Sequence, residues 1–197
     1  MSTVLKILFV TALFVAAGPA FAASNSDWDQ CKDFGNAENN AENVAACTRI
    51  LSDPKETATD RARTFSDRCG QLSEIDSDRA LADCNEAIRL GPESAAGYNS
   101  RGQVYLAKGD PGRAMADIDE AIKRDPKEAI FYDNRAMAYV AKGDYERAIA
   151  AYDEAARVDP KDPKTYAGRG RLRFYMGDYG AAASDLAHAV QGDSSDA

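Results

Sequence analysis

The sequence predicts an all-α fold, a solenoid of stacked helix–turn–helix units. From residue 61 onward, residues of two types recur every 34 positions at three places in the unit. They are Asp76, Asp110, Asp144 and Asp178; Ala80, Ala114, Ala148 and Ala182; and Ala87, Ala121, Ala155 and Ala189. Each interval contains two stretches with apolar or small residues at helical spacing. Because a single helix pair cannot bury both of its faces, neighbouring pairs are expected to stack.

The first 22 residues have the pattern of a secretory signal peptide. Lys6 precedes an apolar run over 7–17, and Ala-Phe-Ala at 20–22 supplies small residues at the positions that a signal peptidase reads. A membrane anchor is the alternative, but this run is short of the roughly 20 residues that a spanning helix needs. We therefore expect cleavage after 22 or 23 and no membrane insertion after signal removal. No cysteine follows the cleavage site, so lipid attachment is not indicated, and the protein is expected to be periplasmic or secreted.

The rest of the chain divides into one cap and four repeat units. Residues 23–60 are expected to form a degenerate helical hairpin that caps the array, and 61–94 a degenerate first unit. Three regular units follow over 95–128, 129–162 and 163–193, with a tail at 194–197. In the third unit a glycine–aspartate turn at 143–144 offers a left-handed helix stop followed by a helix N-cap.

The repeat resembles the tetratricopeptide repeat (TPR), of the exported bacterial type, over residues 61–193. Matching residues in the second and third units are Tyr98, Gly102, Tyr105, Ala114, Ala121, Pro126, Tyr132, Ala136, Tyr139, Ala148, Tyr152, Ala155 and Pro160. The fourth unit keeps Tyr166, Gly170, Ala182 and Ala189 but has Arg173 where an aromatic residue is expected. The small residues at the two closest positions allow the helix axes to approach to about 8 Å.

Four cysteines in an exported chain favour disulfides. Cys69 and Cys84 occupy inward-facing positions on the two helices of the first unit, and Cys31 and Cys47 repeat nearly the same separation upstream. We therefore predict Cys31–Cys47 and Cys69–Cys84. A Cys47–Cys69 link, a four-cysteine zinc site and redox catalysis are the alternatives. The last two lack the short C-x-x-C spacing.

Composition and motifs do not favour catalysis. The formal charge of −8 becomes −9 when Lys6 is lost with the signal, which argues against nucleic acid as a partner. His188 is the single histidine and stands at an exposed repeat position, and no phosphate-binding loop, cofactor motif or metal cluster is present. Asp117 and Asp119 are expected on a solvated face. The recurring arginines are expected to pair with helix acids, with ligand binding as the alternative: Arg101, Arg135 and Arg169.

The resemblance implies that a protein or peptide partner binds the concave side, which the first helices of the units form. The positions that it implies are Asn99, Gln103, Leu106, Asp133, Asn134, Met137, Val140, Lys164, Arg171 and Phe174. Leu106, Val140 and Phe174 recur at one position and would form an apolar stripe, but each position could equally be an ordinary solvent-facing one. Departures from the carboxylate-clamp pattern of some TPR proteins leave that clamp unassigned.

The sequence thus predicts a non-enzymatic adaptor or scaffold. A self-assembling structural module and an accessory subunit of a cell-envelope enzyme are the alternatives. The last unit has no following helix, so we expect an exposed apolar patch at the C-terminal end that pairs with a second copy or another protein. The alternative is that the outer face of the last unit is not apolar enough to need a partner and stays exposed to solvent.

Overall fold

A computed structural model describes residues 23–33 and 40–193. The expected signal peptide lies outside the described residues. Within them the chain forms ten helices and no strand. In pairs, the helices are α1 Asn25–Cys31 and α2 Asn40–Ser52; α3 Ala58–Leu72 and α4 Ser77–Leu90; α5 Ala95–Ala107 and α6 Pro111–Arg124; α7 Ala129–Ala141 and α8 Tyr145–Val158; α9 Pro163–Tyr175 and α10 Tyr179–Asp193. No described helix is long and apolar enough to cross a membrane.

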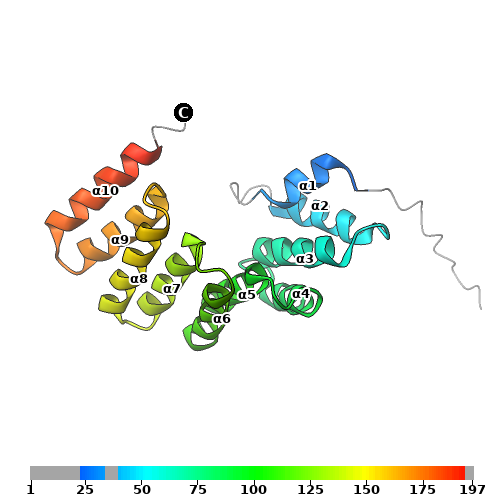
Figure 1. Cartoon of the computed structure of the whole chain (residues 1–197), viewed down its shortest axis with the longest axis horizontal. Helices are drawn as coiled ribbons and strands as arrows, with labels where there is room; N and C mark the ends of the chain where they lie inside the picture. The colour runs from blue at the N-terminus through cyan, green and yellow to red at the C-terminus, as the bar shows by residue number, and fades with distance from the viewer. Residues whose placement is uncertain (1–22, 34–39, 194–197) are drawn as a thin grey trace, which may run out of the picture.

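The pairs follow one another along an arc, with α1 and α2 at one end and α9 and α10 at the other (Figure 1). First helices contact one another from α3 to α5 and from α5 to α7, and each second helix contacts the first helix of the next unit. The first helices therefore lie on the shorter, inner side of the arc, and the second helices form its outer side. This arrangement is the predicted α-solenoid.

The turns inside the regular units are built by the same glycine–aspartate pair. Gly143 has a φ of +74°, a conformation that glycine adopts without strain, and Gly109 and Gly177 adopt it too. The next residue is an aspartate, and the Asp144 side chain accepts a hydrogen bond from the Arg147 backbone N–H. The predicted stop and N-cap are therefore present. α3 begins earlier than the expected boundary at 61, because Thr57 caps it by accepting from the Asp60 N–H.

Small residues let the two helices of a unit lie close together. A Cβ atom added to Gly102 would lie 2.8 Å from Ile118 Cγ1 and 3.2 Å from the Ala114 carbonyl oxygen. Ala136 packs against Ala148 in the third unit, in the same cluster as Tyr152 and Leu172. The core of the array therefore includes a series of small clusters, one at each of the first four helix pairs.

Two disulfides crosslink the N-terminal hairpins. The Sγ atoms of Cys31 and Cys47 are bonded, as are those of Cys69 and Cys84, and no described cysteine is free. All four side chains are fully buried. Each disulfide joins the two helices of one hairpin, α1 to α2 and α3 to α4, in agreement with the predicted pairing.

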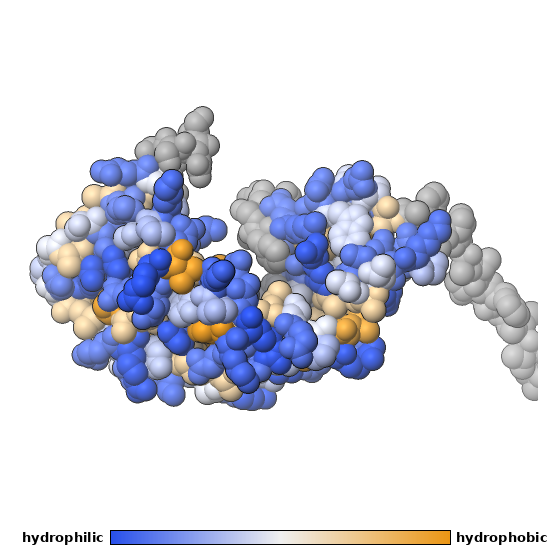
Figure 2. Space-filling model, in the orientation of Figure 1, coloured by the Kyte–Doolittle hydropathy of each residue, from blue (hydrophilic) through white to orange (hydrophobic). Residues whose placement is uncertain are grey.

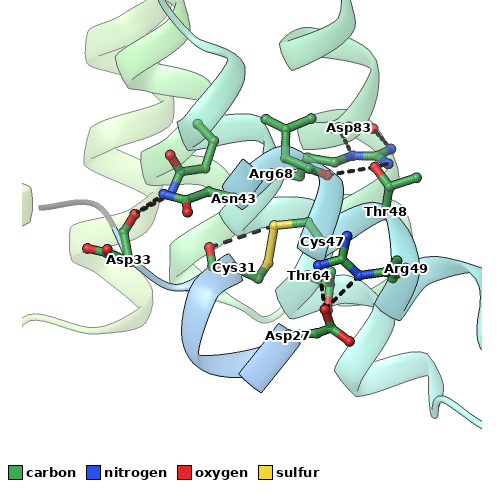
Figure 3. Close-up of a disulfide and its surroundings, with 12 residues drawn as sticks. Asp27, Cys31, Asp33, Asn43, Cys47, Thr48, Arg49, Thr64, Arg68 and Asp83 are labelled. Carbon is green, nitrogen blue, oxygen red and sulfur yellow. Dashed lines mark hydrogen bonds and ion pairs between the residues drawn. A yellow bond between two sulfur atoms is a disulfide. The ribbon is translucent and has the colours of Figure 1, made fainter. Parts of the chain in front are cut away.

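The N-terminal hairpin is joined to the first unit by polar contacts around the first disulfide (Figure 3). Within the hairpin itself, Arg49 on α2 binds the Asp27 carboxylate on α1 at 2.6 Å. Asn43 and Gln71 both donate to the Asp33 carbonyl oxygen, at 2.7 and 2.8 Å. Because Gln71 lies on α3, these bonds hold the end of the first hairpin against the first unit.

Candidate functional site

The inner surface of the arc contains a continuous groove along α3, α5 and α7. Two hollows of about 510 and 610 Å³ adjoin there, and both are bordered by Gly70 and Gln103. We call their combined lining the inner groove. The space-filling view shows a surface hollowed between the two arms of the arc, with small hydrophobic patches in a largely hydrophilic surface (Figure 2).

Five of the residues implied by the resemblance line the inner groove: Asn99, Gln103, Leu106, Asn134 and Met137. Met137 is 51 % exposed and offers the groove an apolar side chain. Asn99 and Asn134 are buried, and the Asn134 side chain donates to the Asn99 side-chain oxygen at 2.8 Å. These two amides therefore tie α5 to α7 as well as facing the groove.

Two further residues of that set line a separate hollow of about 400 Å³ between α7, α8 and α9. Val140 and Arg171 lie there with three tyrosines, Tyr145, Tyr152 and Tyr175. We call this site the aromatic hollow. Tyr145 and Tyr175 meet edge to face with ring centroids 5.3 Å apart, so the second helix of one unit and the first helix of the next share its wall.

The remaining three residues of the set line neither the inner groove nor the aromatic hollow. Lys164 and Phe174 are exposed on α9. Asp133 on α7 is half-buried and accepts a hydrogen bond from Thr165 Oγ1 at 2.9 Å. Burial raises the pKa of Asp133 to about 6, although the Thr165 hydroxyl opposes the shift.

A half-buried carboxylate, Asp67 on α3, lines the inner groove. Its Oδ2 atom is buried without a hydrogen-bond donor among the described residues. Burial raises the pKa of Asp67 to about 6, against the opposing fields of Arg63 and Lys32. An ionised group in this position lacks the partners that usually offset the cost of burial.

Two models of the tetratricopeptide repeat match the sequence, one over residues 76–129 and one over 135–197. Together they span most of the repeat array. The chain is a tetratricopeptide repeat protein. No curated protein matches the sequence as a relative.

Solved TPR structures share the fold. A thermophilic TPR protein of Thermus thermophilus, TTC0263, superposes with a TM-score of 0.70 at 17% identity, over 79% of this chain and 84% of that one. MamA 41-end from Desulfovibrio magneticus RS-1 superposes with a TM-score of 0.60 at 19% identity, over 88% of this chain and 98% of that one. PilF of Pseudomonas aeruginosa superposes with a TM-score of 0.63 at 15% identity, over 79% of this chain and 69% of that one. At these identities the likeness establishes the fold, which is in general that of a protein-interaction scaffold.

The recurring arginine of the TPR units joins one unit to the one before it. Arg101 binds Asp117 of its own unit through Nε and Nη2, each at 2.8 Å, and Asn85 of the preceding unit through Nη1. Arg169 repeats this arrangement with Asp185 and Asp153. Asp117 is therefore buried and paired, so the expectation that it lies on a solvated face is wrong.

Arg68 of the first TPR unit extends the same arrangement. It binds Asp83 of its own unit at 2.7 Å and Thr48 of α2 at 3.0 Å (Figure 3). Arg135 is the exception. It makes no ion pair among the described residues, and its buried Nε has no hydrogen-bond partner. The expected pairing with helix acids holds for Arg101 and Arg169 but is wrong for Arg135.

The last TPR unit exposes apolar side chains. We use the name C-terminal face for six residues whose exposed fractions range from 37 to 72 %: Phe174, Tyr175, Met176, Tyr179, Leu186 and Val190. Leu186 lies one repeat after Tyr152, which the packed α9 leaves only 7 % exposed. Tyr179 likewise lies one repeat after Tyr145. α10 therefore presents the surface that α9 covers on α8.

The single histidine of the sequence packs against the last TPR unit. His188 stacks on Tyr166, with ring centroids 3.9 Å apart, and lies 3.3 Å from the Pro160 carbonyl oxygen. In the described part of the chain, no group of three or more histidine, cysteine, aspartate or glutamate side chains could hold a metal ion.

Sequence reasoning missed Asp67 and the tyrosines of the aromatic hollow. A signal for Asp67 exists, because its repeat position holds Ser100, Asn134 and Gly168 in the other units. A carboxylate at a position that is otherwise small or neutral marks a local specialisation. Tyr175 carries a similar signal, since its repeat position holds Ala107 and Ala141 in the two preceding units. Tyr152 carries none, because its repeat position holds the apolar residues Ile118 and Leu186 in other units.

Proposed function

We propose that this protein is an exported adaptor that binds an extended segment of a partner protein in the inner groove. The observation that carries this proposal is the continuity of the groove across α3, α5 and α7, where Gln103 and Met137 face open space. Hydroxyl and amide groups along the groove can bond a peptide backbone, while Leu106 and Met137 can cover apolar side chains.

Export is proposed from the signal-like sequence and from the paired cysteines. Structural disulfides persist in oxidising compartments and are rare in the bacterial cytosol. We expect the mature protein in the periplasm or outside the cell, beginning at 23 or 24. Cell fractionation with N-terminal mass analysis tests this: an intact N-terminus in the cytosolic fraction would refute export.

Site-specific photo-crosslinking tests the groove. A photoreactive amino acid at Gln103 lies inside the inner groove, and the same probe at Ala150 lies on the exposed surface of α8. We expect a specific crosslinked partner at Gln103 and none at Ala150, and Met137→Glu should remove it. Equal crosslinking at both positions, or no effect of Met137→Glu, would contradict binding in the groove. No catalytic role is proposed for any of these residues.

A second candidate role, self-assembly, is favoured by the C-terminal face. Its residues repeat the positions through which α8 packs on α9, so a second copy can continue the apolar contact at the end of the array. We propose that two copies pair through α10. This role is independent of the inner groove, which lies on other helices.

A further inference from the structure

The inner groove is acidic. Four carboxylates border it: Asp67, Glu74, Asp125 and Glu128. None of its described lining residues is lysine, arginine or histidine. A cationic ligand is therefore matched to this groove, whereas the terminal carboxylate of a peptide would meet no positive partner.

The sign of the charge changes along the inner surface. The aromatic hollow further along the array contains Arg171 and no carboxylate. Lys164 is also exposed on α9. The excess of carboxylates is thus found in the lining of the inner groove and not in that of the aromatic hollow, so it is not uniform along the array.

Asp67 gives this attraction a defined position. Its carboxylate lines the groove beside Ser66 and Ser100, whose hydroxyls bond to each other at 3.0 Å. One carboxylate oxygen of Asp67 is buried with no donor in the described part of the chain. The cations whose fields reach it are Arg63 of its own helix and Lys32 at the end of α1, and no ion pair joins either of them to it. A positive group in the groove would compensate a burial cost that the free protein leaves uncompensated.

The neighbouring hollow, which Glu74 also borders, has an apolar stretch of wall. Leu106, Ala107, Met137 and Ala141 border the hollow next to the one that holds Asp67, and Gln103 borders both. A segment lying along the groove would therefore place a charged side chain at one end and apolar side chains at the other. The Gln103 amide lies where it can bond the backbone between them.

We propose that the inner groove recognises a basic, partly apolar protein segment, with a lysine or arginine side chain against Asp67 and apolar side chains over Leu106 and Met137. This inference rests on the proposed function, since it names the chemistry of the segment that the groove binds.

Three labelled nonapeptides test this charge preference by fluorescence polarisation with the mature full-length protein. The measurement is made at about pH 7.5 and roughly physiological salt, because exposed charges more than about 8 Å apart are then largely screened. The first has two lysines and two leucines in a serine–glycine background. The second replaces the lysines with norleucine, and the third replaces them with glutamate. We expect the lysine peptide to bind about tenfold more tightly than the norleucine peptide, and the glutamate peptide to bind most weakly.

Two variants with the same change of net charge separate recognition from general attraction. Asp67→Asn should weaken the lysine peptide about tenfold and leave the norleucine peptide unchanged. Glu146→Gln, on the exposed surface of α8 and outside every hollow described above, should change neither by more than about twofold. Circular dichroism and thermal melting of both variants verify that they are folded.

The possible failures differ. If the norleucine peptide binds as well as the lysine peptide and Met137→Glu abolishes both, the groove binds peptides but the cation preference is refuted. Equal effects of Asp67→Asn and Glu146→Gln would also refute it. If none of the three peptides binds, both this inference and the proposed function are refuted.

Discussion

Arg135 and Ala151 occupy the repeat positions at which each of the other three TPR units holds an arginine–aspartate pair. The pairs are Arg68–Asp83, Arg101–Asp117 and Arg169–Asp185. Ala151 has no carboxylate, and the Arg135 Nε is buried without a hydrogen-bond partner within residues 23–33 and 40–193. Burial raises the pKa of Asp119 in the preceding unit and the field of Arg135 opposes that shift, but the two form no ion pair.

Ala151→Asp should stabilise the protein. The new carboxylate would stand 16 residues after Arg135, the separation of the Arg101–Asp117 pair. A partly buried, doubly hydrogen-bonded pair of this kind contributes about 1 kcal/mol to the free energy of unfolding. Chemical denaturation of the variant measures the gain. A loss of stability would mean that the packing around Ala151 does not admit the larger side chain.

Asp117→Ala is the matched converse. It would leave Arg101 half-buried and without its carboxylate, as Arg135 is now. We expect a loss of about 2 kcal/mol in the free energy of unfolding, since removing one member of a partly buried pair strands the other. No loss would show that these pairs contribute little to the stacking of the units.

Asp67→Asn should change how stability depends on pH. Burial raises the pKa of Asp67 to about 6 from a usual value near 3.8, so between these values the folded state binds more protons than the unfolded state. Its contribution to stability therefore falls as pH rises through that window, by about 1–2 kcal/mol. The variant should be more stable than the parent at about pH 7.5, with the difference vanishing towards about pH 4.

Denaturation of both proteins from about pH 4 to 8 measures this difference. Asp27 and Asp144 have lowered pKa values because of backbone and arginine hydrogen bonds, respectively, and they are present in both proteins. Their loss of stabilisation at low pH therefore cancels in the comparison. A constant difference across the range would contradict a titrating Asp67.

The disulfides should stabilise the N-terminal half. Non-reducing peptide mapping of the exported protein is expected to find Cys31 linked to Cys47 and Cys69 to Cys84. In the chain-entropy model, closing a loop of this length contributes about 3 kcal/mol. Cys69→Ser with Cys84→Ser should therefore lower the melting temperature, with hydrogen exchange rising first in α3 and α4. Free thiols or a Cys47–Cys69 link would contradict the pairing.

Val140→Glu should weaken partner binding without unfolding the protein, because a segment in the inner groove, which Ala141 borders, is expected to continue along α7 to the aromatic hollow, which Val140 borders. Val140 is 37 % exposed at the edge of the aromatic hollow, so the charge can reach solvent. We expect a change in melting temperature of less than about 3 °C, because exposed substitutions usually cost under about 0.5 kcal/mol. Ala150→Glu on the outer surface of α8 is the control and should affect neither property. A large loss of stability would place Val140 in the core.

Sedimentation over a roughly hundredfold concentration range tests pairing through the C-terminal face. We expect a dimer at high concentration, because Leu186 and Val190 have no covering helix among the described residues. Val190→Lys, at a side chain 70 % exposed, should shift the protein to a monomer with little change in stability. A monomer at every concentration would refute the second candidate role.

Much of this architecture follows from local sequence features. The 34-residue period predicts the helix pairs because each aspartate after a left-handed glycine starts a helix and each small residue permits a close contact. The same periodicity aligns the cysteines of the first unit across its hairpin. The regular helices α5 to α10 lie within the unit boundaries that the repeat predicts.

The repeat positions predict which residues lie on the concave side, but they do not predict the charge or the hydrogen bonding of the inner groove. The repeat assigns Gln103 and Met137 to the concave side, since first helices form that side in any array of this kind. The Asn99–Asn134 bond could not be foreseen, because it joins side chains of two units whose separation depends on the stacking of α5 and α7. The burial of Asp67 likewise depends on neighbours from other helices.

Local patterns in the chain are thus enough to predict the helical units, their order and the candidate cysteine pairs, because all of these arise from interactions within one unit. What each polar side chain meets between units is visible only in the folded array. There Asp117 lies in an ion pair, Arg135 lacks one among the residues that the structure describes, and Asp67 and Glu74 line the acidic inner groove. The physical reason is that burial and charge pairing depend on the separation of side chains from different helices, and packing of the whole array sets that separation.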